Sequence, residues 1–391
     1  MAIIRGIRDT KNVVTADTKL RNVDKLVTLL QPERGPFVTL LDELSQTRSC
    51  NTMKWEHGER DYLAKTVQVN GALNTTATAL VVDDASYVKV NTQIYNKTSG
   101  EAVRVTAVNT ATNTLTIVRE AGSTTAAAIA DNEVLILASE ANEESVAYSD
   151  AITNESSLLT GYLQEFETAI QMSNIQMTWE EYTNPDWKEI MSQAIGEHKE
   201  KMEAAFWLGL GELVASGPNN HRVFYTTGVR SFIAANGAAN ISTVTGSLTE
   251  AKLSAWAKGI YPYGTPSKKV FFASPAGRLI LNRLGANNIE TPRSEDTFGN
   301  AISRVVVNGN LFKIVESQLF TKWGLDDHIF CVDMGHVVKR FFAGNGQSWQ
   351  TSWKTNVQAN DAKSRKDVLY TICGLQIRNG LAHGLIKGFS T

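Results

Sequence analysis

The longest regular pattern of apolar and polar positions in the sequence runs from Asn184 to Pro218. Apolar residues recur there at steps of three and four, which predicts one apolar stripe along an α-helix. Asn184 suits the N-cap, Pro185 suits the first helical position, and Gly217 and Pro218 end the pattern. We therefore expect one helix of about 45–50 Å, against which other elements pack.

The apolar stripe identifies the residues that should make the contacts of this helix. We predict packing by Trp187, Ile190, Met191, Ala194, Ile195, Met202, Phe206 and Leu213. His198 lies on the same stripe, and we interpret it as a hydrogen-bonded core or interface histidine rather than a ligand. A long core helix of an ordinary α+β protein is the alternative interpretation of the whole stretch.

The chain before this helix changes character several times. Residues 1–24 are polar and weakly periodic, which is typical of an arm that only another surface orders. Residues 23–30 fit a short helix, and a second short helix begins at Pro36. Residues 52–69 predict extended strand. Five short alternating runs within residues 73–137 predict a small β-barrel or sandwich inserted as a subdomain.

The chain after Pro218 alternates helices and strands. Residues 219–240 are rich in glycine, alanine and asparagine and predict loops, and the Ser247–Glu250 capping box opens a helix. A buried strand over 268–274 precedes a helix capped by Ser274. A hairpin over 304–317 and a strand pair at 328–333 and 336–343 follow. Residues 368–378 predict a long strand with a short return, and together these elements predict an α+β domain.

Composition and cysteine spacing narrow the class of protein. Apolar residues make up 42% of the chain, so a sizeable core can form. The start is too polar for a signal segment, and no run is long enough to span a bilayer, so we expect a soluble protein. Cys50, Cys331 and Cys373 are odd in number and widely spaced, which favours reduced thiols in a cytosolic fold.

Charge is distributed unevenly although the net charge is only −2. No Lys or Arg occurs between Arg119 and Lys188, a span that contains thirteen acidic residues. From Thr265 to the end of the sequence there are sixteen Lys and Arg residues and nine Asp and Glu residues. One half of the fold could therefore attract the opposite half of a neighbouring copy. Solvated faces of either sign are the alternative. A sequence-specific nucleic-acid binder would have a stronger basic excess.

No pattern of residues predicts catalytic chemistry. Phosphate loops, nucleophile elbows and zinc-binding motifs are absent from the sequence. The densest group of metal-ligand types is Asp326, Asp327, His328, Asp333 and His336. The strand predicted between its members sends neighbouring side chains to opposite faces, so we predict no metal and no cofactor.

Two tryptophans near the end of the chain stand beside basic residues. Trp349 and Trp353 lie close in sequence to Lys339, Arg340 and Lys354. Such a group can stack nucleic-acid bases or anchor a contact between subunits. We favour the subunit contact.

The order of these parts resembles the major capsid protein of tailed bacteriophages, the Hong Kong 97-type fold. The segments that carry the resemblance most clearly are PERGPFVTLLDEL at 32–44 and LYTICGLQIRNGLAHGLIKGF at 369–389. The resemblance implies an α+β fold with a long spine helix, an extended loop and an inserted small β-barrel or sandwich. It divides the chain into an N-terminal arm (1–48), an extended loop region (49–180) with a β-rich insertion at about 72–138, a peripheral-domain spine helix (181–222), an axial domain (223–345) and closing peripheral strands (346–391).

The resemblance also implies a function. It indicates a structural virion protein, not an enzyme, that self-assembles into hexamers and pentamers of an icosahedral phage head. Expected partners are other copies of the chain, a separate scaffolding protein, a portal, decoration proteins and packaged double-stranded DNA held by non-specific contacts. No membrane is implied, and the protein would be made in the host cytoplasm. We predict contacts between subunits at Trp55, Glu140, Glu143, Glu144, Trp349 and Trp353.

Two other classes of function remain open at this point. One is a different virion protein from the tail or from a decoration layer, although the long amphipathic helix argues against an all-β tail tube. The other is a hydrolase with a β-rich accessory domain that uses Asp326, Asp327 or His336. Lys54, Lys65 and Asn356 have the residue types of a lysine–asparagine cross-link, which the sequence does not otherwise predict.

Overall fold

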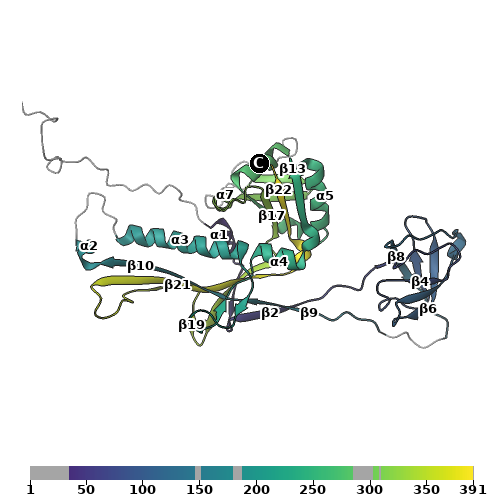
Figure 1. Ribbon diagram of the computed structural model, residues 1–391, viewed down its shortest axis with the longest axis horizontal. Helices are drawn as coiled ribbons and strands as arrows, with labels where there is room; N and C mark the ends of the chain where they lie inside the picture. Colours follow the sequence, from purple (N-terminus) through teal and green to yellow (C-terminus); the bar gives the residue numbers. More distant parts are fainter. Residues whose placement is uncertain (1–34, 146–150, 179–186, 285–302, 308–309, 391) are drawn as a thin grey trace, which may run out of the picture. The chain divides into compact units, whose positions relative to one another are not determined.

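The described residues form two compact units. The computed structural model describes residues 35–145, 151–178, 187–284, 303–307 and 310–390 (Figure 1). The first unit comprises residues 1–57 and 160–391, and the second comprises residues 58–159. The predicted arm and the short helix at 23–30 lie outside the described residues. Among the described residues, no helix has both the length and the apolar character that crossing a membrane requires.

One sheet of the first unit is built around a long strand, β21 (Ser364–Ile377). Its order is β1 (Thr47–Cys50), β18 (Val337–Gly344), β21 and β10 (Gln164–Ser173), with β19 (Gln347–Ser348) paired to β18 and β20 (Ser352–Lys354) paired to β21. We call it the β21 sheet. The short helix α2 (Asn174–Thr178) follows β10.

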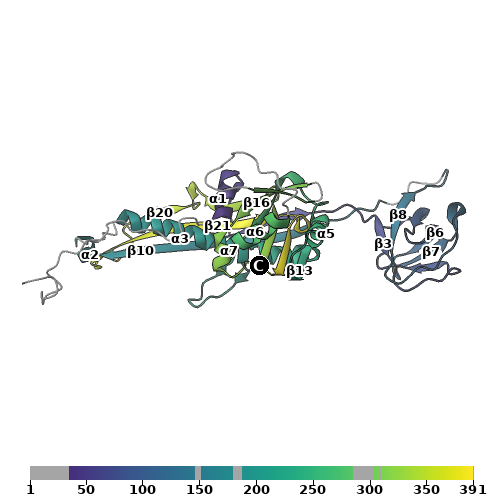
Figure 2. The same cartoon turned by 90° about the horizontal axis from the view of Figure 1, so that it is seen from above.

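The long helix α3 (Trp187–Leu208) lies along β10 and β21, as the two views in Figures 1 and 2 show. His198 fastens it to both strands, because its Nδ1 lies 3.0 Å from Thr168 Oγ1 and its Nε2 lies 2.8 Å from Thr371 Oγ1. Burial lowers the pKa of His198 to about 4, so the imidazole is neutral at pH 7. The interpretation of His198 as a hydrogen-bonded core residue is confirmed.

Helix α3 is shorter than predicted. Its 22 described residues span about 33 Å, and the predicted start at Asn184 lies outside the described residues. The helix ends before Gly209, where the backbone of a second segment comes close: a Cβ atom there would lie 2.3 Å from the Thr226 carbonyl oxygen. The chain then turns into the short pair β11 (Leu213–Val214) and β12 (Val223–Phe224). The prediction that Leu213 packs along this helix is therefore wrong.

The predicted packing residues differ in burial along α3. Ala194, Met202 and Phe206 are buried, and the side chains nearer its start, Trp187, Ile190 and Met191, are partly buried. Ile195 is 42% exposed, so its predicted packing is wrong within a single chain. The stripe therefore faces the protein fully only in the second half of the helix.

Two residues that the pattern did not select hold the end of α3 in place. Glu203 is fully buried and accepts hydrogen bonds from the backbone N–H groups of Phe37 and Val38, at 3.1 and 2.9 Å. Those groups open helix α1 (Pro36–Glu43), whose N-cap, Gly35, has no side chain to bind them. Trp207, also fully buried, donates from Nε1 to Glu203 at 2.9 Å.

The second sheet of the first unit surrounds β14 (Lys269–Ala273). Its order is β13 (Ile241–Gly246), β22 (Gly384–Phe389), β17 (His328–Asp333), β14, β16 (Asn310–Glu316) and β15 (Ser303–Val307). We call it the β14 sheet. Helices α5 (Glu250–Ile260) and α6 (Pro275–Leu284) supply Trp256 and Leu281 to the core on one face, against Phe271 and Ile314.

The opposite face of the β14 sheet meets α1, α3 and α7 (Gln318–Lys322) through aromatic rings. The Trp207 ring centroid lies 4.7–5.1 Å from those of Phe37, Phe272, Phe320 and Phe330. Five rings from five separate elements therefore make one core.

Several strands were predicted correctly but with wrong partners. The segments at 328–333 and 336–343 form β17 and β18, yet β17 pairs with β14 and β22, while β18 pairs with β1 and β21. The predicted return after β21 is β22, which joins the β14 sheet instead. β17 is apolar from Ile329 to Val332 and lies between β14 and β22, as expected of a buried interior strand. A boundary at residue 345 therefore does not separate the two sheets.

Local predictions after Pro218 need two corrections. The N-cap of α5 is Thr249, whose Oγ1 accepts from Lys252 N, and not Ser247. Helix α4 (Val229–Asn236) lies within the stretch predicted as loops, because Val229, Phe232 and Ile233 form a short buried stripe. The prediction that Ser274 caps α6 is confirmed, since its Oγ accepts from Gly277 N at 3.0 Å.

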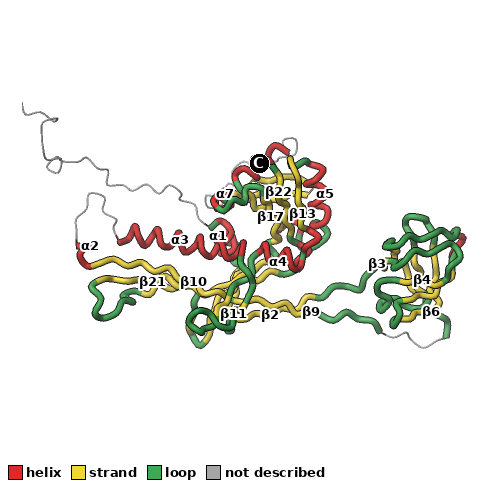
Figure 3. Tube along the Cα trace, in the orientation of Figure 1, coloured by secondary structure: helices red, strands yellow, loops and turns green. Residues whose placement is uncertain are grey.

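The second unit is a small antiparallel barrel, in which strands make up nearly all the regular structure (Figure 3). The strand order is β3 (Thr66–Gln68), β8 (Val134–Glu140), β5 (Thr92–Tyr95), β6 (Ala102–Asn109), β7 (Thr114–Val118) and β4 (Ala79–Val81). A bridge between Val69 and Val82 closes the ring. The five predicted strands are confirmed, and β3 lies before the predicted start at residue 72.

Candidate functional site

The face of the β21 sheet that lies away from α3 carries Trp55 and Trp349, two of the residues predicted to contact other subunits. Alternate residues of β21 point to opposite faces. Thr371 and Cys373 point toward α3, where they contact His198 and Met202. Tyr370, Ile372 and Gln376 therefore point to the other face.

Trp55 lies in the core of this face and is not free for a contact between subunits. It is only 5% exposed and packs with Leu163 and Ile372. It belongs to β2 (Lys54–Glu59), which pairs with β9 (Ser157–Tyr162). Gly161 makes room for the indole, because a Cβ there would lie 2.1 Å from it. The prediction for Trp55 as a subunit contact is wrong at the level of the single chain.

Trp349 and Trp353 are both half-buried on or beside this sheet. The rings of Trp349 and Tyr370 meet edge to face with centroids 5.3 Å apart, and Lys354 Nζ lies 4.7 Å and 4.6 Å from those two centroids. Trp353 lies in β20 opposite Leu369. Lys354, Trp349 and Tyr370 thus form a partly exposed group of the kind that a second protein can cover.

Three arginines that sequence reasoning did not bring together lie on the same face. Arg48 of β1 and Arg340 of β18 are direct neighbours across a parallel strand pair. Arg340 donates to Gln376 Oε1 at 2.8 Å and to the Ser49 carbonyl oxygen at 3.2 Å. Burial lowers the pKa of Arg340, and the charges of Arg48 and Arg378 lower it further. These arginines are 38 to 330 positions apart in sequence, so only the strand register reveals the cluster.

The predicted acidic contacts lie in the second unit, at and beyond the end of β8. Glu140, Glu143 and Glu144 are all exposed. Glu140 lies 3.6 Å from Lys89 Nζ, and Glu143 accepts from Asn91 Nδ2 at 3.3 Å. Glu144 has no hydrogen bond or ion pair with another described residue. The stretch therefore presents three carboxylates to solvent with little compensating charge.

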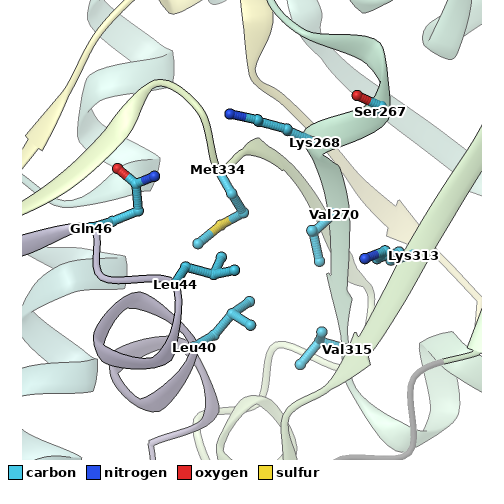
Figure 4. Close-up of a pocket in the computed structure, with 9 residues that line it drawn as sticks. All are labelled: Leu40, Leu44, Gln46, Ser267, Lys268, Val270, Lys313, Val315 and Met334. Carbon is cyan, nitrogen blue, oxygen red and sulfur yellow. The ribbon is translucent and has the colours of Figure 1, made fainter. Parts of the chain in front are cut away.

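A groove of about 310 Å³ lies between the end of α1 and the β14 sheet (Figure 4). Apolar side chains form most of its wall, and Lys268 and Lys313 stand beside them. The apolar residues are Leu40, Leu44, Val270, Val315 and Met334. Leu44 is 48% exposed, so this groove leaves apolar surface open on the first unit.

The candidate metal ligands are separated by β17 and engaged in structural contacts. Asp326 accepts from Thr321 Oγ1 at 2.7 Å, and Asp327 lies 2.6 Å from His328 Nδ1. Asp333, buried at the other end of the strand, accepts from Thr265 N and Gly335 N. Among the residues that the structure describes, no three side chains of ligand type come close enough to hold a metal ion.

Comparison with known proteins identifies relatives of the whole chain. A family model described as the SU10 major capsid protein matches residues 8–390. The capsid asymmetric unit of cyanophage A-1(L) is similar in structure, with a TM-score of 0.51 and 9% identity over 96% of this chain and 99% of that chain. A structure from Mycobacterium phage Bobi gives a TM-score of 0.48 and 12% identity over 96% and 97% of the two chains. The capsid of the myovirus XM1 gives 0.45 and 11% over 98% and 99%. No curated protein matches the sequence.

Proposed function

The chain belongs to the SU10 major capsid protein family, and we propose that its copies form the hexamers and pentamers of an icosahedral phage head around double-stranded DNA. It is a structural protein of the virion with the α+β fold of Hong Kong 97-type capsid proteins. The predicted family and fold class are confirmed. The proposal assigns no chemical reaction to the chain.

The observation that carries the proposal is the family match over residues 8–390, which leaves almost no part of the chain outside it. Two features of the surface support it. The first unit leaves an apolar groove beside α1 open, and the second presents an acidic stretch at Glu140–Glu144. Both kinds of surface suit contacts between copies of a building block.

We assign parts of the fold to roles in the shell. Helix α3 and the β21 sheet serve as the spine and peripheral domain, and the β14 sheet with its helices serves as the axial domain. β18 then belongs with the spine and β22 with the axial domain, which replaces the predicted division at residue 345. Residues 1–48 serve as the arm, and the barrel of residues 58–159 is carried by the extended loop.

The partners proposed beyond other copies follow from the function. A separate scaffolding protein guides assembly, a portal occupies one vertex, and decoration proteins bind the finished shell. Packaged DNA is held by electrostatic contacts that do not depend on its sequence. Synthesis takes place in the cytoplasm of the bacterial host.

Negative-stain electron microscopy after light scattering tests the proposal. We expect the expressed protein, with scaffold supplied, to form shells, tubes or rings of five and six copies. A chain that stays monomeric with every scaffold candidate from the same genome would contradict it.

Reversing the acidic stretch should impair assembly without unfolding the chain. In the triple variant Glu140→Lys, Glu143→Lys and Glu144→Lys, all three exposed side chains would repel a basic neighbour. We expect particle yield to fall about tenfold or more, the effect of roughly 1.4 kcal/mol lost per contact. Particle counts and a circular dichroism melt are the measurements. The matched glutamine triple, which removes charge without reversing it, should lose less, and normal yield from the lysine triple would remove charge pairing from the proposal.

A further inference from the structure

We propose that Arg48, Arg340 and Arg378, together with the Gln376 amide, form a carboxylate-binding site that receives the acidic stretch Glu140–Glu144 of a second copy. The inference rests on the proposed self-assembly and names the surface that the acidic stretch meets. Three observations on the β21 sheet support it. The strand register brings the arginines together, no described carboxylate pairs with them, and two buried N–H donors beside them have no acceptor.

Register places the positive charges together. Arg48 and Arg340 are Cα partners in the parallel pair of β1 and β18. Side chains directly opposite each other on neighbouring strands share a face, and like charges in that position destabilise the pair. Arg340 and Gln376 share that face, because the Arg340 guanidinium donates to the Gln376 carbonyl oxygen at 2.8 Å. Arg378 follows β21 directly and its charge acts on Arg340.

Described residues provide no counter-charge for this cluster. Arg340 donates only to neutral acceptors, the Gln376 side chain and the Ser49 backbone. Neither Arg48 nor Arg378 forms an ion pair with any residue that the structure describes. By contrast, Arg119 in the barrel is paired with Glu101 at 2.6 Å and Arg278 with Glu316 at 2.7 Å. Among the described residues, Arg48, Arg340 and Arg378 therefore lack the carboxylate partner that Arg119 and Arg278 have.

Unpaired donors mark the place where an anion would bind. Gln376 is fully buried, and its Nε2 has no acceptor among the described residues. The Nε of Arg378 is likewise buried without an acceptor. Leaving such donors unpaired is unfavourable, because each has lost its hydrogen bonds to water without gaining an acceptor. A carboxylate entering between the guanidinium groups would supply oxygen acceptors to several of them, and the guanidinium fork matches carboxylate geometry.

Charge complementarity identifies the second copy as the source of that carboxylate. Every chain carries this cluster on the first unit and an exposed acidic stretch on the second, so each copy offers one half of the contact and receives the other. Contacts of this head-to-tail kind close into rings when the rotation between successive copies closes. The partly buried donors suit a single inserted carboxylate side chain, whose geometry the guanidinium fork matches.

Charge reversal on both sides tests the contact in the full-length chain. The variant with Arg48→Glu and Arg378→Glu should reduce particle yield about tenfold or more, because its carboxylates would face those of the neighbour. Arg230→Glu is the matched control, since Arg230 is an exposed arginine on α4 of the same unit, and it should assemble within about twofold of wild type. Combining the double variant with the lysine triple at Glu140, Glu143 and Glu144 should restore yield to within about threefold, because opposite charges then face each other again.

The measurements separate the proposed self-assembly from the proposed arginine site. Wild-type yield measures the proposed function, and the ratio of variant to wild-type yield measures this inference. Normal assembly of the double variant would overturn the inference, and so would impaired assembly that the combined variant does not restore. Normal shells that no longer retain DNA in a gel-shift assay would overturn it in favour of a phosphate site. If the double variant does not fold, Arg48→Glu alone, at an exposed position, replaces it with the same readout and expected direction.

Discussion

Replacing Trp207 with alanine should lower the free energy of unfolding of the first unit by about 3–5 kcal/mol. The side chain is fully buried, and four other rings surround it at centroid distances of 4.7–5.1 Å. Removing the indole leaves a cavity where α1, α3, α7 and the β14 sheet meet, and leaves Glu203 without one donor. Those elements are fixed by the rest of the fold, so the cavity cannot collapse fully.

Urea denaturation followed by tryptophan fluorescence measures this loss. All eight tryptophans lie outside residues 58–159, so the signal reports the first unit and not the barrel. Trp187→Ala is the matched control. Trp187 is only partly buried at the other end of the same helix, where its main described partner is the Arg365 guanidinium at 4.7 Å. We expect a loss of about 1 kcal/mol there, and equal losses for the two variants would contradict the assignment of Trp207 as the centre of this core.

Changing Glu203 to glutamine should remove a pH dependence of stability between about pH 4.5 and 7. Burial raises the pKa of Glu203 from 4.5 to about 7, although the three hydrogen bonds that its carboxylate accepts act in the opposite direction. An acid whose pKa is higher in the folded chain binds a proton more tightly there than in the unfolded chain. Its stabilising effect is therefore complete below about pH 4.5 and is lost as the pH rises through about 7.

The difference in unfolding free energy between wild type and Glu203→Gln isolates this group from all others that titrate. We expect that difference to fall by roughly 3 kcal/mol from pH 4.5 to pH 8, since one pKa unit corresponds to about 1.4 kcal/mol. Glu197→Gln, on the exposed side of α3, should show no such change. A difference that stays constant with pH would show that Glu203 does not titrate in this range.

The sequence patterns predict where helices and strands lie better than they predict which strands pair with each other. The helix at Pro36, the barrel strands and the strand at β14 follow from capping residues and periodicity, which are local properties. The predicted pairing of β17 with β18 is wrong, because a short turn between two apolar strands usually indicates a hairpin. Here the turn at Met334–Gly335 instead carries the chain from one sheet to the other. Which neighbour a strand has depends on the whole sheet.

The candidate site was the least predictable part for the same reason. The exposed acids at Glu140–Glu144 were visible as a run of charge. Arg48, Arg340 and Arg378 are ordinary basic residues in sequence, and only the pairing of β1 with β18 makes them a cluster. Glu203 looked like a solvated residue because charged residues are rarely buried, and its partners lie 165 and 166 positions away.

The interior place of β22 has a consequence for how the chain acquires its structure during synthesis. β22 separates β13 from β17, so the β14 sheet is incomplete until residues 384–389 have left the ribosome. At roughly 5–20 residues per second, the stretch from Gly246 to Phe389 takes about 7–30 s to make. The barrel, whose strands all lie between Thr66 and Glu140, can close long before. A nascent chain would thus carry one finished unit and one open apolar sheet, and host chaperones that shield such sheets would meet this protein before any other copy does.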